Sequence, residues 1–458
     1  MDNPGVSVRS ASFRCALLTA ILVCGSCNGR KATPPAVDDL DQAASEVDTA
    51  AKAYRTSGLP WEAKDVRLGA PLPAEQNAAP LIRRAIKNLD TERYNAELPS
   101  IQSAISVGSY AKASSLLAGY DASLGLLIQA SKLPGVDFQR DWDLGPAVLF
   151  SEFYPMKLLG RLLDLRAEVG CGNHDIRGAI GDLKAAWTLG DFAGSDPNLI
   201  GMLAQVAMQR AALRSVQRCA FLVKDDPKAL AQLSGVIAHG GAVDFAYAIR
   251  GQAYMGLCTS RNLKGFGGIK AFSSPLASSP TMLDPKTLLR TGLPKDRDSR
   301  AFVARHLQSW TKVKLLADEY QDNPAQLQKS MARLGKQVES RRTASNMLNL
   351  MFFPTFTETS TIPVVLKADL VANRALLAAL LIRARTGKIP ASIRDIPGDW
   401  VDPFDGKPLR VRQTGPWFRV YSVGPNLKDD GGVFKTELKD RQSTAYDIGA
   451  AFEPEKPK

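Results

Sequence analysis

Residues 156–190 read MKLLGRLLDLRAEVGCGNHDIRGAIGDLKAAWTLG and predict two helices joined by a short turn. In each half, apolar residues recur at the three- and four-residue spacing that places them on one face of a helix. These residues are Met156, Leu159, Leu162, Leu163 and Val169 in the first half, and Ile176, Ile180, Leu183 and Trp187 in the second. Because the Gly-containing link at 170–173 is short, the two helices are expected to pack antiparallel as a hairpin.

Similar helical spacing extends over most of the chain. A third apolar stripe covers residues 199–216, in a helix that is expected to start near Asp196 and Pro197. Further helices are predicted at residues 40–56, 74–88, 298–319 and 325–348. A tetratricopeptide-like array is the alternative arrangement, but the sequence shows no fixed repeat period of that kind. It therefore predicts a mostly α fold of stacked antiparallel helical hairpins.

The C-terminal part of the chain differs in kind. A helix is predicted at 364–385, where several charged residues exclude a membrane span, and Gly387 is expected to end it. Apolar residues then alternate on both sides of a turn at 414–416, which predicts an antiparallel hairpin. They are Leu409, Val411, Phe418, Val420 and Tyr421. The sequence thus predicts a small C-terminal α+β module, a helix plus an antiparallel β-meander.

The amino terminus has the features of an export signal. Two arginines precede an uncharged apolar run at 15–24, which is too short to span a bilayer. Gly25 and Ser26 lie directly before Cys27, and this arrangement resembles a bacterial lipobox, which implies a lipid on the Cys27 sulfur after cleavage. Cys24 stands where the lipobox prefers Leu, so the alternative is ordinary cleavage after Ser26 and a soluble secreted or periplasmic protein.

These signals divide the chain into four parts. Residues 1–27 form the signal peptide with its lipobox, and the polar, Pro-containing residues 28–39 form a tether. Residues 40–350 form the helical body, in which a Gly- and Ser-rich stretch at 256–297 marks where two subdomains could meet. Residues 362–458 form the C-terminal module.

Composition and charge narrow the class of protein. The 458 residues are 45% hydrophobic, which is typical of folded proteins rather than disordered ones. The net charge is +12, and residues 261–345 hold most of the excess, with 16 Lys or Arg against seven Asp or Glu. An exported protein meets the anionic surfaces of the envelope, so no nucleic-acid partner is expected. A solvated basic face without a partner is the alternative.

Neither cysteines nor histidines point to catalysis. After cleavage and lipidation only Cys171, Cys219 and Cys258 carry free thiols, which allows at most one intramolecular disulfide. The chain has three histidines and neither an H-E-x-x-H nor a G-x-S-x-G motif, so zinc-protease and serine-hydrolase chemistry have no basis. No catalytic residue is assigned.

The segment 370–432 contains a helix, then G-x-x-P, D-P-F-x-G-x-P, a strand pair, and Y-S-x-G followed by acidic residues. This order resembles the globular part of the major pseudopilin of type II secretion. The matching residues are Gly387, Pro390, Asp402, Pro403, Phe404, Gly406, Pro408, Tyr421, Ser422, Gly424 and Asn426, with Asp447 and Ile448 matching the closing D-I. The whole chain is also similar to a group of uncharacterised exported bacterial proteins and lipoproteins that pair a helical body with such a tail.

The resemblance implies a calcium site in the loop after the strand pair. The implied ligands are oxygen atoms of Val423, Asn426, Asp429, Asp430 and Asp447. Calcium prefers such hard donors, carboxylates, amides and backbone carbonyls. Asn426 stands where the family usually has Asp, which removes one negative charge from the site. A Gly- and Asp-rich turn that simply faces solvent is the alternative.

Together these features predict a non-enzymatic interaction or scaffold protein of the cell envelope, anchored at a membrane surface. Its expected partners are membrane lipid, through Cys27, and envelope proteins, with the helical body as the binding surface. The alternative is an enzyme or solute-binding protein whose site lies in the helical body and leaves no sequence motif.

Overall fold

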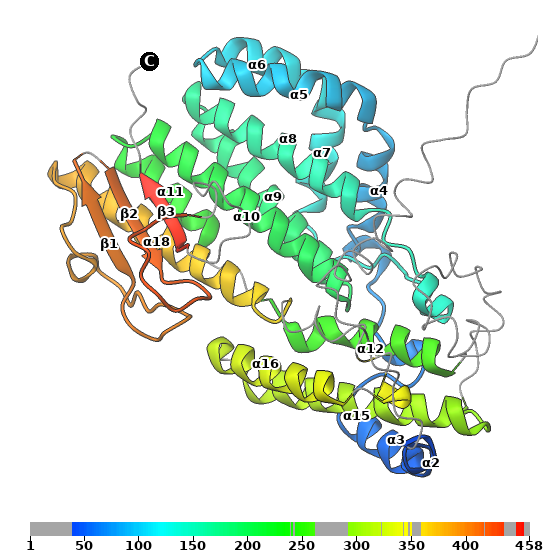
Figure 1. Cartoon of the computed structure of the whole chain (residues 1–458). Helices are drawn as coiled ribbons and strands as arrows, with labels where there is room; N and C mark the ends of the chain where they lie inside the picture. The colour runs from blue at the N-terminus through cyan, green and yellow to red at the C-terminus, as the bar shows by residue number, and fades with distance from the viewer. Residues whose placement is uncertain are drawn as a thin grey trace, which may run out of the picture.

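The computed structural model shows a mostly α protein with a small three-stranded sheet near its C-terminus, which confirms the predicted fold class (Figure 1). It describes residues 39–238, 240, 243–261, 292–321, 323–341, 343–346, 349, 359–415, 417–434 and 446–452. Cys27, the signal peptide and nearly all of the tether lie outside the described residues, as does the middle of the stretch at 256–297. No helix in the described part is long and apolar enough to cross a membrane.

The predicted hairpin is formed by α8 (Phe153–Gly172) and α9 (Ile176–Gly194). Both helices pack against a third, α10 (Leu199–Leu222). Asn198, one residue after the predicted start, begins α10, because its side chain accepts a hydrogen bond from the Gly201 amide at 2.7 Å. The three helices are the centre of the molecule.

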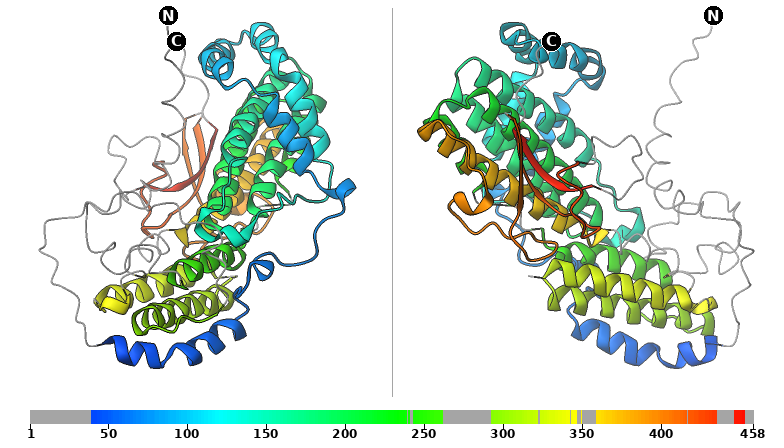
Figure 2. Two further views of the ribbon diagram at one scale, coloured as in Figure 1. Left: turned by 90° about the vertical axis from the view of Figure 1, so that its right-hand side faces the viewer. Right: turned by 60° about the vertical axis from the view of Figure 1, so that its left-hand side comes forward.

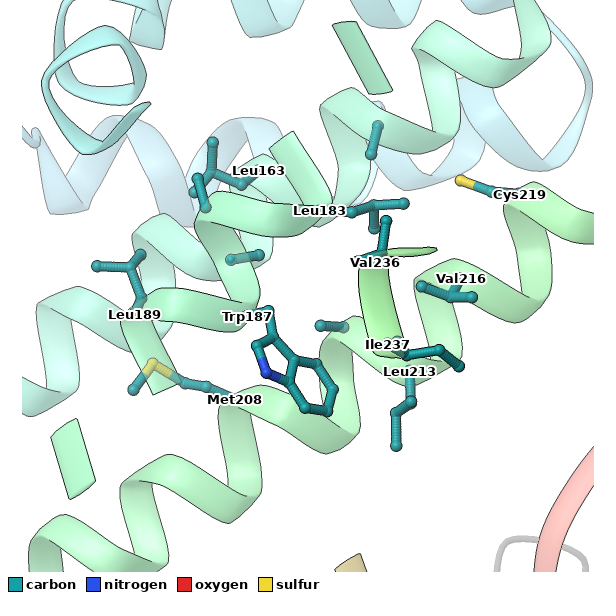
Figure 3. Packing of buried hydrophobic residues seen from close by; sticks show 14 of the residues in the cluster. Leu163, Leu183, Trp187, Leu189, Met208, Leu213, Val216, Cys219, Val236 and Ile237 are labelled. Carbon is teal, nitrogen blue, oxygen red and sulfur yellow. The ribbon is translucent and has the colours of Figure 1, made fainter. Parts of the chain in front are cut away.

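The core between these helices is tightly packed. Figure 3 shows apolar side chains gathered between the ribbons, among them Leu163, Leu183, Trp187, Leu189, Met208, Leu213, Val216, Val236 and Ile237. Gly190 lets α9 approach α10, because a Cβ atom there would lie 2.7 Å from Gln209 Cγ and 3.2 Å from the Gln205 carbonyl oxygen. Two further helices, α11 (Pro227–Ile237) and α18 (Ile362–Thr386), also pack on α10.

Four shorter helices pack against α8 from the N-terminal half of the chain. They are α4 (Ala79–Lys87), α5 (Thr91–Ser106), α6 (Tyr110–Leu117) and α7 (Asp121–Ala130). The helix predicted at 74–88 is shorter than expected: a 3-10 turn at Ala74–Gln76 precedes α4, and Pro80 lies in the first turn of α4. Proline is well tolerated there, because the amide it lacks has no partner in a first turn.

A second layer of helices lies beneath the first (Figures 1 and 2). It consists of α2 (Leu40–Ser45), α3 (Val47–Thr56), α12 (Phe245–Arg261), α15 (Arg297–Glu319) and α16 (Pro324–Ser340). Leu199 and Met202 of α10 belong to its apolar cluster, so α10 joins both layers. The helix predicted at 40–56 is broken at Glu46, whose carboxylate accepts hydrogen bonds from Arg305 and Gln308 at 2.7 Å each.

The C-terminal module consists of α18 and an antiparallel sheet in the order β1-β2-β3. The strands are β1 (Arg410–Thr414), β2 (Trp417–Ser422) and β3 (Ile448–Phe452). The predicted hairpin is confirmed, with Val411 opposite Val420, and Gly387 ends α18 in the left-handed conformation at φ 75°. β3, which the sequence pattern did not predict, pairs with β2 and packs with it on α18.

Cys171, Cys219 and Cys258 are buried free thiols. Cys171 of α8 and Cys219 of α10 are hydrogen-bonded to each other, and this contact and burial raise the pKa of the Cys219 thiol well above its usual range. Cys258 lies in α12, in a different apolar cluster. Cys171 and Cys219 are thus the pair that a single disulfide would join.

The Asp402 carboxylate holds the C-terminal module together. It is fully buried, and its Oδ1 accepts hydrogen bonds from the Ser422 hydroxyl at 2.7 Å and the Phe404 amide at 2.9 Å. Its Oδ2 accepts from the Val423 amide at 2.9 Å and the Arg410 guanidinium at 2.5 Å. Since Asp402 belongs to the D-P-F-x-G motif and Ser422 to the Y-S-x-G motif, the two motifs meet at this carboxylate.

We predict that Asp402→Ala destabilises the protein by about 3 kcal/mol or more. The change removes the acceptor of the Ser422 hydroxyl and of the Val423 amide, both buried, at about 1–3 kcal/mol each. Urea unfolding followed by circular dichroism measures the loss. Lys407→Ala, at an exposed position in the same turn, is the control and should stay within about 0.5 kcal/mol. Equal unfolding midpoints for the two variants would contradict the role of Asp402.

Candidate functional site

Basic side chains face one another across the helical body. Arg210, Arg214 and Arg218 follow at four-residue spacing and therefore share one face of α10. Lys157 and Arg161 do the same on α8. All of these except Arg210 line two neighbouring cavities between the helices. We call these two cavities together the arginine groove.

The two cavities of the arginine groove share a wall. The larger has a volume of about 590 Å³ and is bounded by α5, α6, α8, α10 and the end of β3. The smaller has a volume of about 290 Å³ and lies mainly between α8 and α10. Arg161, Arg214 and Arg218 line both cavities. Their size is in the range of small-molecule sites in proteins.

Acidic side chains neutralise part of this positive charge. Glu168 of α8 is buried and forms an ion pair with Arg218 at 2.5 Å, while its Oε1 also accepts a hydrogen bond from the Ser215 hydroxyl at 2.9 Å. Asp369 of α18 pairs with Arg210, just outside the groove, also at 2.5 Å. Glu168 Oε1 lies 4.0 Å from Arg161 Nη1, at the limit of an ion pair.

Arg214 is the arginine of the groove that has no acidic partner in this network. It forms no hydrogen bond and no ion pair with any residue that the structure describes, although it lines both cavities. The residue is exposed to solvent in part; removal of the rest of its side chain from water lowers its pKa, and repulsion from Arg210 and Arg218 adds to this effect. An anion bound in the groove would reduce that repulsion and replace water as the hydrogen-bond acceptor of this exposed guanidinium.

Asp164 lies on α8 and lines the smaller cavity. Its side chain is buried, with the residue 1% exposed, and Oδ1 has no hydrogen-bond partner among the described residues. Burial raises the pKa of this carboxyl to about 8, against the effect of Arg161, Arg214 and Arg218, which lower it. The neutral, protonated form therefore predominates at neutral pH. A buried polar atom without a partner is costly, which makes Asp164 a candidate ligand contact.

The far end of the larger cavity is apolar. Phe221 and Leu222 of α10, Ile105 of α5 and Phe452 of β3 line it. The rings of Phe221 and Phe452 are in contact, with centroids 5.7 Å apart. The groove thus runs from a cationic region around Arg214 to an aromatic and aliphatic region at the edge of the sheet.

This arrangement can bind an anion, and the residues that line the two cavities include no cysteine or histidine. No sequence motif predicted this site. The signal that could have found it is the run of Arg210, Arg214 and Arg218 in a helix that has no other charged residue. The sequence pattern could not predict which helix packs against these arginines. Arg161 and Asp164 come close to them only because α8 packs on α10.

The residues predicted to bind calcium lie together in the loop after β2. The Asn426 side-chain amide donates to Asp430 Oδ2 at 2.8 Å, and the Asp430 amide donates to Asp447 Oδ1 at 3.3 Å. Asp429 Oδ1 accepts hydrogen bonds from the Gly431 amide and the Tyr421 hydroxyl. The fifth predicted ligand, Val423, is buried beside them, and its amide donates to Asp402 Oδ2.

In this conformation, groups of the loop itself donate hydrogen bonds to its acidic side chains. The second oxygen of Asp447 accepts from the Gly432 amide at 2.6 Å, and burial raises the pKa of this carboxyl to about 6. Arg419 donates to the Gly432 carbonyl, which brings a positive charge to the loop. No three acidic, histidine or cysteine side chains in the described ranges are grouped to hold a metal ion, so Asp429, Asp430 and Asp447 would have to move to share calcium.

Compared with protein-family models, with curated proteins and with solved structures, the chain matches none. The assignment of function therefore rests on the chemistry of the groove, on the sequence signals and on the resemblance of the tail.

We predict that Asp164 makes stability depend on pH. Its folded-state pKa of about 8 exceeds the value near 4 of an unfolded aspartate, so the native state holds an extra proton between these values. This contribution is complete below about pH 4 and is lost as the pH rises through 8. In Asp164→Asn, the free energy of unfolding should fall less steeply with rising pH than in the wild type. Between pH 5 and 7 the two slopes should differ by up to about 1.4 kcal/mol per pH unit.

Urea unfolding of both proteins at several pH values measures this difference in slope. Asp143→Asn, which changes an exposed aspartate, is the matched control and should run parallel to the wild type. Parallel curves for wild type and Asp164→Asn would show that Asp164 does not carry the proton.

The calcium prediction calls for a separate titration. Binding to the folded state should raise the thermal midpoint at millimolar calcium chloride, because a ligand of the native state alone stabilises it. Asp447→Asn should remove the rise. Magnesium chloride at equal ionic strength is the control, and an unchanged midpoint at millimolar calcium would remove the metal assignment.

Proposed function

We propose that this chain is an exported, non-enzymatic binding protein of the cell envelope, held at a membrane surface by a lipid on Cys27. Its helical body binds an anionic group of its partner in the arginine groove. The observation that carries this proposal is Arg214, a guanidinium in a cavity wall between Arg161 and Arg218 with no acidic partner in the described part of the chain.

Several features support a binding role over catalysis. Guanidinium groups match phosphate and carboxylate oxygens in geometry and remain charged at every physiological pH. The N-terminal signal and the resemblance of the tail to the pseudopilin both suit a protein that works outside the cytoplasm. Anionic groups are abundant there, on lipids and on envelope polymers.

The second candidate is a solute-binding protein or an enzyme with its site in the same groove. Asp164 favours it, because a buried carboxyl with a raised pKa, facing a cavity, is typical of sites that bind or transform small molecules. The two candidates differ in what occupies the groove: part of a larger envelope component in the first, and a small molecule by itself in the second.

We predict that the protein binds inorganic phosphate weakly and that Arg214→Gln reduces the affinity about tenfold, since a hydrogen bond to a charged group contributes about 1.5–3 kcal/mol. Titration calorimetry at low salt measures the binding. Arg84→Gln, at an exposed arginine of α4, is the matched control and should bind as the wild type does. Equal losses in both variants would mean that general surface charge attracts the phosphate and would overturn the site.

We also predict that the wild type sediments with membranes and is released by detergent, whereas Cys27→Ala remains in the soluble exported fraction. The physical reason is that the lipid is the proposed anchor. Envelope fractionation with detection of a C-terminal tag measures it, and crosslinked capture of both forms identifies partners lost with the anchor. A soluble wild type would favour cleavage after Ser26, and a membrane-bound variant would place the anchor elsewhere.

A further inference from the structure

We propose that the natural ligand of the arginine groove is a phosphate-bearing amphiphile with a hydroxyl group next to its phosphate. The phosphate lies among Arg161, Arg214 and Arg218, the hydroxyl donates to Asp164 Oδ1, and the hydrocarbon chain lies along the apolar end of the larger cavity. This inference rests on the proposed function, since it names the chemical class of the anion that the groove binds.

We infer the position of the phosphate from the arginines, because only some of them are paired with an acidic side chain. Arg218 is held by Glu168 at 2.5 Å, whereas Arg161 lies 4.0 Å from the same carboxylate and Arg214 has no acidic partner in the described part. Two guanidinium groups are therefore available on opposite walls, one on α8 and one on α10. A phosphate offers several oxygens in different directions, so it can accept from both walls at once.

We infer the hydroxyl group of the ligand from the side chain of Asp164. The residue lines the smaller cavity, and its buried Oδ1 has no hydrogen-bond partner among the described residues. The cavity that it lines is also lined by the same three arginines. A donor placed there by the ligand would satisfy this oxygen while the adjacent phosphate meets the guanidinium groups. A second anionic group is disfavoured at this position, because the Glu168 carboxylate lies nearby.

The hydrocarbon chain follows from the shape of the larger cavity. At about 590 Å³ it exceeds what a phosphate and a hydroxyl fill. Ile105, Phe221 and Leu222 are only partly buried although they line it, so an apolar chain would remove their exposed surface from water. The groove is thereby suited to a ligand with a charged end and an apolar end.

The test compares three probes on the intact exported chain by titration calorimetry, each below its micellar concentration. Lauroyl glycerol phosphate carries the phosphate, the hydroxyl and the chain. Glycerol 3-phosphate lacks the chain, and lauroyl propanediol phosphate lacks only the hydroxyl beside the phosphate. We expect the first to bind at least tenfold more tightly than the second, and several-fold more tightly than the third.

Variants locate each part of the ligand. Arg214→Gln should weaken all three probes about tenfold. Ile105→Gln should weaken only the two lauroyl probes, and Leu68→Gln, at a leucine that is 61% exposed and outside the groove, is its control. Asp164→Leu should erase the difference between the probes with and without the hydroxyl. Circular dichroism of each variant verifies folding, and the three-probe comparison on the wild type decides the matter if a variant does not fold.

The possible outcomes separate this inference from the proposed function. If glycerol 3-phosphate binds as tightly as lauroyl glycerol phosphate, and Arg214→Gln weakens both, the anion site stands and the amphiphile is refuted. If the hydroxyl makes no difference in the wild type, the role of Asp164 is refuted. If Arg214→Gln changes the binding of no probe, the proposed function fails together with the inference.

Discussion

The burial of α10 is the constraint on which the rest of the structure depends. This helix of 24 residues packs on α8, α9, α11, α12, α18 and the sheet, and its first turn also enters the core of the second layer. A helix enclosed on so many sides keeps its charged side chains on the face that its neighbours cover least. In α10 that face carries Arg210, Arg214 and Arg218. The position of the groove is therefore a consequence of how the neighbouring helices pack around α10.

The electrostatics of the site follow from the same packing. Burying acids next to a row of arginines is favourable only where each charge finds a partner, because the loss of hydration is otherwise uncompensated. Glu168 and Asp369 find theirs in Arg218 and Arg210. Asp164 does not, and it avoids the cost by keeping its proton, which is why burial raises its pKa. Arg214 remains charged, and this imbalance is the physical basis of an anion site.

In the C-terminal module, two sequence motifs stabilise the fold. The D-P-F-x-G and Y-S-x-G motifs are joined through Asp402, which accepts hydrogen bonds from both. The acidic residues of the following loop are engaged by amides of that loop and by Asn426. In this chain the two motifs thus have a structural role in the turn and strand geometry, and the calcium that the resemblance implies stays a prediction.

The sequence by itself determined the class of fold, because apolar periodicity depends only on local spacing: it predicted the helices of the core, the end of α18 at Gly387 and the pairing of β1 with β2. It could not predict β3, which is short and pairs at a distance along the chain, or the break at Glu46, which Arg305 and Gln308 stabilise from another helix. Only the tertiary structure decided the site. Arg161 and Asp164 lie on α8 and Arg214 lies on α10, and whether a polar side chain of a cavity has a partner is a property of packing that no local spacing records.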